Sequence, residues 1–166
     1  ANAYLERCKI IYTWLDYSGA INDFKKAIDI EPAFAEAYYS LAITYKYSTS
    51  YFITQDFDIA RYGITVAMRY LNKSIKINPY FESAYIERGE CKRFLNDFRG
   101  AIIDFSFVIN INPKNAKAYY ERGVTIYERY EGTKELQLYK KDACLDWYRA
   151  KDLGNSDAKE KIVSFC

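Results

Sequence analysis

Three short segments of the chain repeat the same group of side chains with acid–base chemistry. The segment AYIERG, residues 84–89, places a phenol, a carboxylate and a guanidinium within four positions, from Tyr85 to Arg88. Groups of these kinds, held close together, could transfer protons. The chain has the segment again as AYYERG at 118–123 and as AYLERC at 3–8. Because a catalytic group is normally needed once, the repetition predicts an architectural role.

The rest of the sequence offers little for catalysis or metal binding. It has no histidine, which removes the commonest general base near neutral pH and the commonest metal ligand. Its four cysteines contain no C-x-x-C pair, which argues against a zinc site. No glycine-rich phosphate loop or nucleophile-elbow pattern occurs. We therefore expect no enzyme activity, no catalytic residue, no metal and no cofactor.

Composition indicates a soluble globular chain. Of 166 residues half are apolar, and the net charge is only +2, so neither disorder nor nucleic-acid binding is indicated. The longest nearly apolar run, residues 101–111, is broken by Asp104 and is far shorter than the roughly 20 residues of a membrane-spanning helix. We expect no membrane insertion and favour the cytoplasm over export. Export stays open, because the chain begins at Ala1 without a methionine.

A long-range repeat organises the chain. When Tyr4 is aligned with Tyr85, matching residues follow without a gap: Gly19 with Gly100, Ala20 with Ala101, Phe24 with Phe105, and Pro32 with Pro113. Small and large apolar residues recur three or four positions apart, and each block closes with a proline through which a helix cannot continue. Each block therefore predicts a pair of helices.

This order of aromatic, small, alanine and proline residues resembles the tetratricopeptide repeat, or TPR, over nearly the whole chain. The resemblance implies an all-α fold, an α-α superhelix or TPR solenoid, in a single domain covering residues 1–166. The four repeats would be 1–34, 35–81, 82–115 and 116–155, followed by a capping helix at 156–165. The closing segment resembles the end of many bacterial TPR proteins, which suggests a bacterial source.

Two of the repeats are longer than the standard 34 residues. The surplus lies at 48–58 in the second repeat and at 130–141 in the fourth. Apolar spacing predicts that the second helix of repeat two runs from about 56 to 77. Tolerated loop growth explains such insertions better than a dedicated binding element does.

Arginines and aspartates occur together in the repeats. Repeats one, three and four each have both, whereas repeat two has Leu41 and Tyr70 at the two positions. Pairing within a repeat leaves no charge unmatched, whereas pairing between neighbouring repeats would orphan two, and a buried unpaired charge is costly. We therefore predict three structural ion pairs: Arg7 with Asp23, Arg88 with Asp104, and Arg122 with Asp146.

The TPR resemblance also implies a groove, lined by the first helix of each repeat, that holds an extended or helical peptide of a protein partner. Its positions form three columns: Leu5, Tyr39, Ile86 and Tyr120; Lys9, Ile43, Glu90 and Val124; and Tyr12, Lys46, Arg93 and Tyr127. Tyrosine and arginine are favoured at binding surfaces, although the chain's 18 tyrosines alone would place some here. We expect a non-catalytic interaction scaffold.

One ligand class and one alternative role can be judged from the same positions. TPR proteins that clamp the carboxylate of heat-shock chaperones use basic and amide residues where this chain has Leu5, Lys9, Ser40, Ser83 and Glu87, so the clamp is absent. The alternative role is self-assembly, in which solenoid ends or insertions pack against a second copy to form a homo-oligomer.

The C-terminal cysteines form a possible pair. Cys144 lies eleven residues before Asn155 and Cys166 eleven after it, so an antiparallel turn there would bring them to the same level. They could form a disulfide in an oxidising compartment, and would otherwise be buried free thiols.

Overall fold

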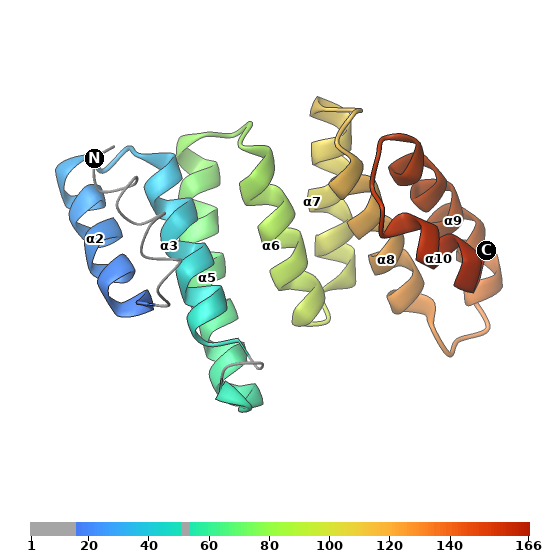
Figure 1. Ribbon diagram of the computed structural model, residues 1–166, viewed down its shortest axis with the longest axis horizontal. Coiled ribbons are helices and arrows are strands. Elements are labelled where there is room, and N and C mark those ends of the chain that lie inside the picture. Colours follow the sequence, from blue (N-terminus) through green and yellow to red (C-terminus); the bar gives the residue numbers. More distant parts are fainter. Residues whose placement is uncertain (1–15, 51–53) are drawn as a thin grey trace. The chain divides into compact units, whose positions relative to one another are not determined.

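The computed structural model describes residues 16–50 and 54–166, and this part of the chain is α-helical without a β-strand. Figure 1 shows the helices in chain order. Their bounds are α2 (Tyr17–Ile30), α3 (Ala35–Ser48), α5 (Phe57–Ile77), α6 (Glu82–Phe94), α7 (Phe98–Ile111), α8 (Ala116–Tyr130), α9 (Leu136–Asp152) and α10 (Ala158–Phe165). The chain divides within α6 into two compact units, one ending at Glu87 and the other running from Arg88 to Cys166.

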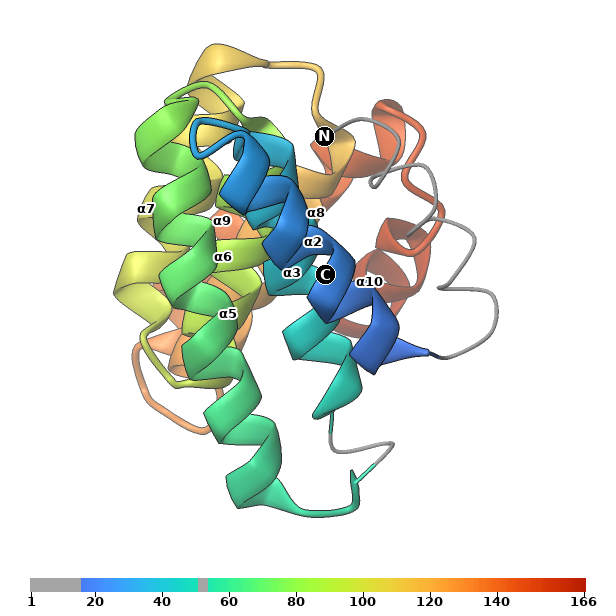
Figure 2. The same cartoon turned by 90° about the vertical axis from the view of Figure 1, so that its left-hand side faces the viewer.

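The first unit is built on the pairing of α2 with α3 and of α3 with α5 (Figure 2). Asp16 caps α2 by accepting a hydrogen bond from the Gly19 amide at 2.9 Å. The helix buries Ala20 and Phe24 against Leu41 of α3, at the helical spacing that the sequence shows.

The longest described helix, α5, begins near the end of the first insertion. Asp56 caps it by accepting from the amides of Asp58 and Ile59, so the helix begins one residue after the predicted start. Near its other end, the buried Ser74 hydroxyl donates to the Ala35 carbonyl of α3 at 2.9 Å.

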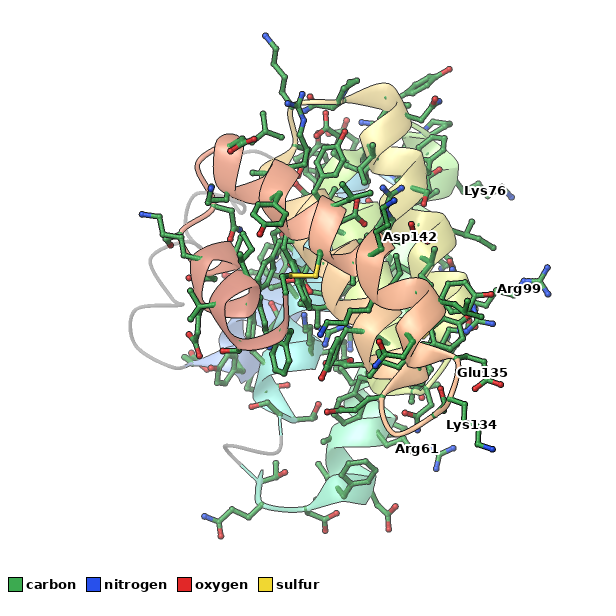
Figure 3. All side chains as sticks on the ribbon, turned by 90° about the vertical axis from the view of Figure 1, so that its right-hand side faces the viewer. Arg61, Lys76, Arg99, Lys134, Glu135 and Asp142 are labelled. Carbon is green, nitrogen blue, oxygen red and sulfur yellow. A yellow bond between two sulfur atoms is a disulfide. The ribbon has the colours of Figure 1, made fainter. Side chains whose placement is uncertain are left out.

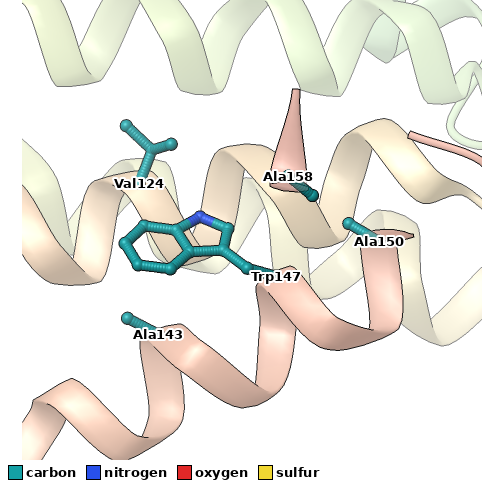
Figure 4. Close-up of a cluster of buried hydrophobic side chains, with 5 residues drawn as sticks. All are labelled: Val124, Ala143, Trp147, Ala150 and Ala158. Carbon is teal, nitrogen blue, oxygen red and sulfur yellow. The ribbon is translucent and has the colours of Figure 1, made fainter. Parts of the chain in front are cut away.

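In the second unit, α6 pairs with α7 and α8 pairs with α9. In each pair, an aromatic side chain of the second helix packs against a glycine of the first. A Cβ atom on Gly89 of α6 would lie 2.7 Å from the Phe105 ring of α7, and one on Gly123 of α8 would lie 2.7 Å from Trp147 Nε1 of α9. Figure 4 shows Trp147 within its buried cluster, which includes Ala158 of α10. Because glycine has no side chain, the two helices of each pair can approach closely at these positions.

The second insertion is partly helical. The segment 130–141 includes the end of α8, a link at 131–135 and the first residues of α9. Tyr130 and Tyr139 stack at a centroid distance of 3.9 Å across this link. The insertion therefore lengthens α9 as well as the connection.

Candidate functional site

Arg88 of the AYIERG segment joins the two helices of one hairpin. Arg88 of α6 donates from Nε and Nη2 to the two carboxylate oxygens of Asp104 on α7, at 2.9 and 2.7 Å. Lys92 Nζ lies 2.8 Å from the same carboxylate, which is only 2% exposed. Charge-assisted bonds of this geometry fix the two helices to each other.

The corresponding arginine of the next repeat makes the same bidentate contact. Arg122 of α8 donates to both carboxylate oxygens of Asp146 on α9, at 2.8 and 2.7 Å, and also to the Ser106 hydroxyl at 3.1 Å. Burial raises the pKa of Asp146 in spite of the arginine. Asp23 is buried in α2, and its predicted partner Arg7 lies outside the described residues.

In the first unit, the predicted groove residues of α3 are half-buried. The Tyr39 ring lies 5.1 Å from that of Phe81, and Lys46 Nζ donates to Glu87 Oε2 of α6 at 2.7 Å. Ile43 is half-buried as well. The predicted residues Leu5, Lys9 and Tyr12 lie outside the described part of the chain.

In the second unit, the groove columns of α6 and α8 carry a second set of ion pairs. Arg93 Nη2 donates to Glu121 at 3.0 Å and Nη1 to Glu128 at 2.9 Å. Glu90 pairs with Lys117 at 2.8 Å. These bonds join the first helices of successive repeats, whereas Arg88 and Arg122 act within repeats.

Two residues predicted to face a ligand are buried instead. Ile86 is 6% exposed and Val124 is 7% exposed. Val124 packs in the cluster of Trp147, which α10 closes through Ala158 (Figure 4). Ile86 directly precedes Glu87, whose bond to Lys46 holds this part of α6 against α3. Side chains in these positions complete the core.

The cap also covers the last groove position. The Phe165 ring of α10 lies 4.4 Å from that of Tyr127. Tyr120 stays half-buried, and its pKa is raised by burial and then by the charges of Glu121, Asp157 and Glu160. The two predicted groove tyrosines of this unit, Tyr120 and Tyr127, are therefore both half-buried against the cluster that includes Trp147 and Ala158.

Sequence reasoning missed the pairs between repeats, although the sequence contains a signal for them. Lys46 and Arg93 share one repeat position, and Glu87 and Glu121 share another, one repeat further on. The pattern of a base in one repeat with an acid in the next would have predicted both bonds.

A disulfide joins the last two helices. Cys144 of α9 is bonded to Cys166, which follows α10, with their Cα atoms 5.8 Å apart. Figure 3 shows the sulfur–sulfur bond beside the ribbon of the second unit. Cys91 is a buried thiol. The bond fastens the cap to the helix against which it packs.

Among residues 16–50 and 54–166, no three His, Cys, Asp or Glu side chains are grouped so that they could hold a metal ion. The helices described in that part of the chain are all too short or too polar to cross a membrane.

Comparison with known proteins gives the fold. Residues 16–46 match the family model of the TPR repeat. The structure is similar to that of a double mutant of MamA RS-1, with a TM-score of 0.67 and 17% identity, covering 92% of this chain and 74% of that one. The fold is that of the TPR proteins.

Two proteins with TPR repeats in their names also resemble the chain. The first TPR domain of Spaghetti (RPAP3), solved with an HSP90 peptide, matches with a TM-score of 0.61 and 21% identity, over 74% of this chain and 87% of that one. Tetratricopeptide repeat protein 36 of Danio rerio is 28% identical over 104 residues, which are 60% of this chain. The match spans about half the length of that relative, 51%.

Proposed function

We propose that this protein is a non-catalytic scaffold that binds a peptide segment of a protein partner on the first helices of its repeats. The proposal includes a single domain of four repeats with a cap. The observation that carries it is the packing of Tyr39 and Tyr120. Both side chains are half-buried, and each packs on one side, Tyr39 against Phe81 and Tyr120 against the cluster of Trp147. Side chains held in this way lose little conformational entropy on binding, which favours tyrosine at binding surfaces.

Ion pairs between the first helices of the repeats limit the kind of peptide. Lys46 is bonded to Glu87, Arg93 to Glu121 and Glu128, and Lys117 to Glu90. A peptide carboxylate would have to compete with these acids for the same cations. The RPAP3 domain was solved with a peptide that ends in aspartate, and we propose that this chain does not share that mode of binding.

Binding of short synthetic peptide pools to the immobilised protein tests the proposal. We expect a Tyr39→Ala plus Tyr120→Ala variant to lose at least about tenfold in affinity, because each large aromatic anchor contributes about 1 kcal/mol or more. The matched control is Tyr62→Ala plus Tyr80→Ala, which removes two tyrosines that are 68% and 72% exposed. Unchanged binding by the first variant would refute the proposal. A dimer that buries Tyr39 and Tyr120 would favour self-assembly instead.

We also infer an oxidising location from the Cys144–Cys166 bond, in place of the cytoplasm that the sequence favours, because disulfides are rare in reducing compartments. Thiol titration of protein purified without reductant tests this inference: fewer reactive thiols before reduction than after it are expected. We propose a bacterial source from the closing segment of the chain alone.

A further inference from the structure

We propose that a hollow between α9 and α10 is a second docking site, which binds an acidic segment of a protein partner that also carries large apolar side chains. The α9–α10 hollow, as we name it, has a volume of about 520 Å³ and is lined by Lys151 of α9 and by Lys159, Ile162 and Val163 of α10. This volume is typical of ligand sites in proteins. The hollow lies outside the first helices of the repeats, so the inference goes beyond the proposed function and does not depend on it.

The disulfide sets the two walls of the hollow against each other. Lys151 follows Cys144 by seven residues along α9, and Lys159 precedes Cys166 by seven residues. Seven residues make about two helical turns, so each lysine lies on the same face of its helix as the cysteine. Because Cys144 is bonded to Cys166, the two lysines belong to facing walls of one hollow.

The positive charge of the hollow is not neutralised by the protein itself. Lys151 and Lys159 are exposed, and neither forms an ion pair among the described residues. Lys151 Nζ instead lies over the Tyr148 ring, 5.6 Å from its centroid. Cations on the first helices differ, since Arg93, for example, is bonded to two acids. A carboxylate in the hollow would therefore meet two positive charges without having to displace an acid.

The other two lining residues favour an apolar side chain beside that carboxylate. Val163 is 88% exposed, although it is apolar and large. Ile162 is half-buried and packs against the cluster of Trp147, so its position is fixed by the core. A leucine or a similar side chain that covers these two residues would remove apolar surface from water. An acidic segment without apolar residues would gain the charge interaction alone.

The test uses three short fluorescent peptides, in which glutamate alternates with leucine, glutamine with leucine, or glutamate with serine. Binding to protein purified without reductant is measured by anisotropy at about 50 mM and about 200 mM salt, which changes the screening length. At the lower salt, we expect the glutamate–leucine peptide to bind at least about fivefold more tightly than either of the others, because each of them lacks one interaction. Higher salt should reduce its advantage over the glutamine–leucine peptide.

A charge variant assigns this binding to the hollow. Lys151→Gln plus Lys159→Gln should weaken binding of the glutamate–leucine peptide by about fivefold. The control, Lys134→Gln plus Lys141→Gln, removes two other exposed lysines, the first of which Figure 3 labels, and should change binding by less than about twofold.

An apolar variant tests the other interaction. Val163→Ser should weaken binding by about threefold, because part of the apolar contact is lost. The control, Leu138→Ser, replaces a residue of α9 that is 74% exposed and does not line the hollow, and it should leave binding unchanged. The substituted side chains are exposed, and circular dichroism of each variant checks that the helices are retained.

The outcomes separate this inference from the proposed function. Weaker binding by the lysine and valine variants, with full binding by Tyr39→Ala plus Tyr120→Ala, supports the second site. Equal binding of the three peptides, failure of the glutamate–leucine peptide to bind, or loss of its binding in the tyrosine variant alone overturns the inference, and the last result would favour the first helices. Binding to vesicles of anionic phospholipid in place of the peptide would also overturn it, because the hollow would then contact a membrane surface.

Discussion

Replacing Asp104 by asparagine should destabilise the second unit strongly. Asp104 is the most enclosed of the paired carboxylates, and it meets Arg88 through two bonds and Lys92 through a third contact. An asparagine keeps the shape but presents one acceptor oxygen and no charge, so two cations lose their counter-charge.

The size of the effect follows from the burial of the three groups. Removing one partner of a buried ion pair costs about 3–5 kcal/mol. The side chains of Arg88 and Lys92 are 17% and 18% exposed, so water partly solvates them once the carboxylate is gone. We therefore expect a loss of about 3 kcal/mol in the free energy of unfolding, a large share of the 5–15 kcal/mol of an ordinary domain.

Urea denaturation followed by circular dichroism measures this loss, with Asp142→Asn as the control. Asp142 is exposed, so the same substitution there should change stability by less than about 0.5 kcal/mol. A second variant, Arg88→Met plus Asp104→Leu, replaces the pair with apolar groups and should recover at least half of the loss. A loss below about 1 kcal/mol for Asp104→Asn would refute the reasoning.

Three further predictions follow from the second unit. Reduction of the Cys144–Cys166 disulfide, which joins residues 22 positions apart, should lower the free energy of unfolding by about 3 kcal/mol. Urea denaturation with and without dithiothreitol measures this loss, and an unchanged midpoint would contradict a stabilising role of the disulfide. Gly123→Ala should destabilise by about 1–2 kcal/mol in thermal unfolding, because its Cβ would meet Trp147, and this outweighs the gain in helix propensity. Since the folded pKa of Asp146 exceeds its ordinary 3.8, folding takes up a proton there, so its contribution to stability falls as the pH rises from 3.8 through the raised pKa. A carboxyl NMR titration giving an ordinary value would exclude this.

The helices are predictable from the sequence because their ends are marked by short-range chemistry. Asp16 and Asp97 occupy one repeat position, and each accepts from an amide three residues on, at 2.9 Å. Pro113 follows α7 in the same way that Pro32 follows α2. The second insertion was harder to place, because nothing between Gly132 and Lys141 stops a helix, and α9 begins within it.

The accessibility of the groove positions could not be predicted in the same way. Residues of one column point in the same direction from their helices. The exposure of each one, however, depends on the side chains that pack beside it. Tyr39 and Ile86 share a column, yet Tyr39 is half-buried and Ile86 is in the core. Val124 is buried because it packs in one cluster with Trp147 of α9 and Ala158 of α10.

The ion pairs within repeats and those between repeats have different roles in stability and in ligand recognition. Bonds within a repeat, such as that of Arg88 with Asp104, are buried and hold one hairpin together. The bond of Arg93 with Glu128 between repeats is more exposed, so it contributes little to stability but occupies a cation that a ligand could otherwise bind. Because Arg93 is bonded to two acids of α8, a substitution that removes one of them changes the charge presented to a ligand while the other bond still joins α6 to α8. Ligand preference can therefore change on this surface while the Arg–Asp pairs keep the fold.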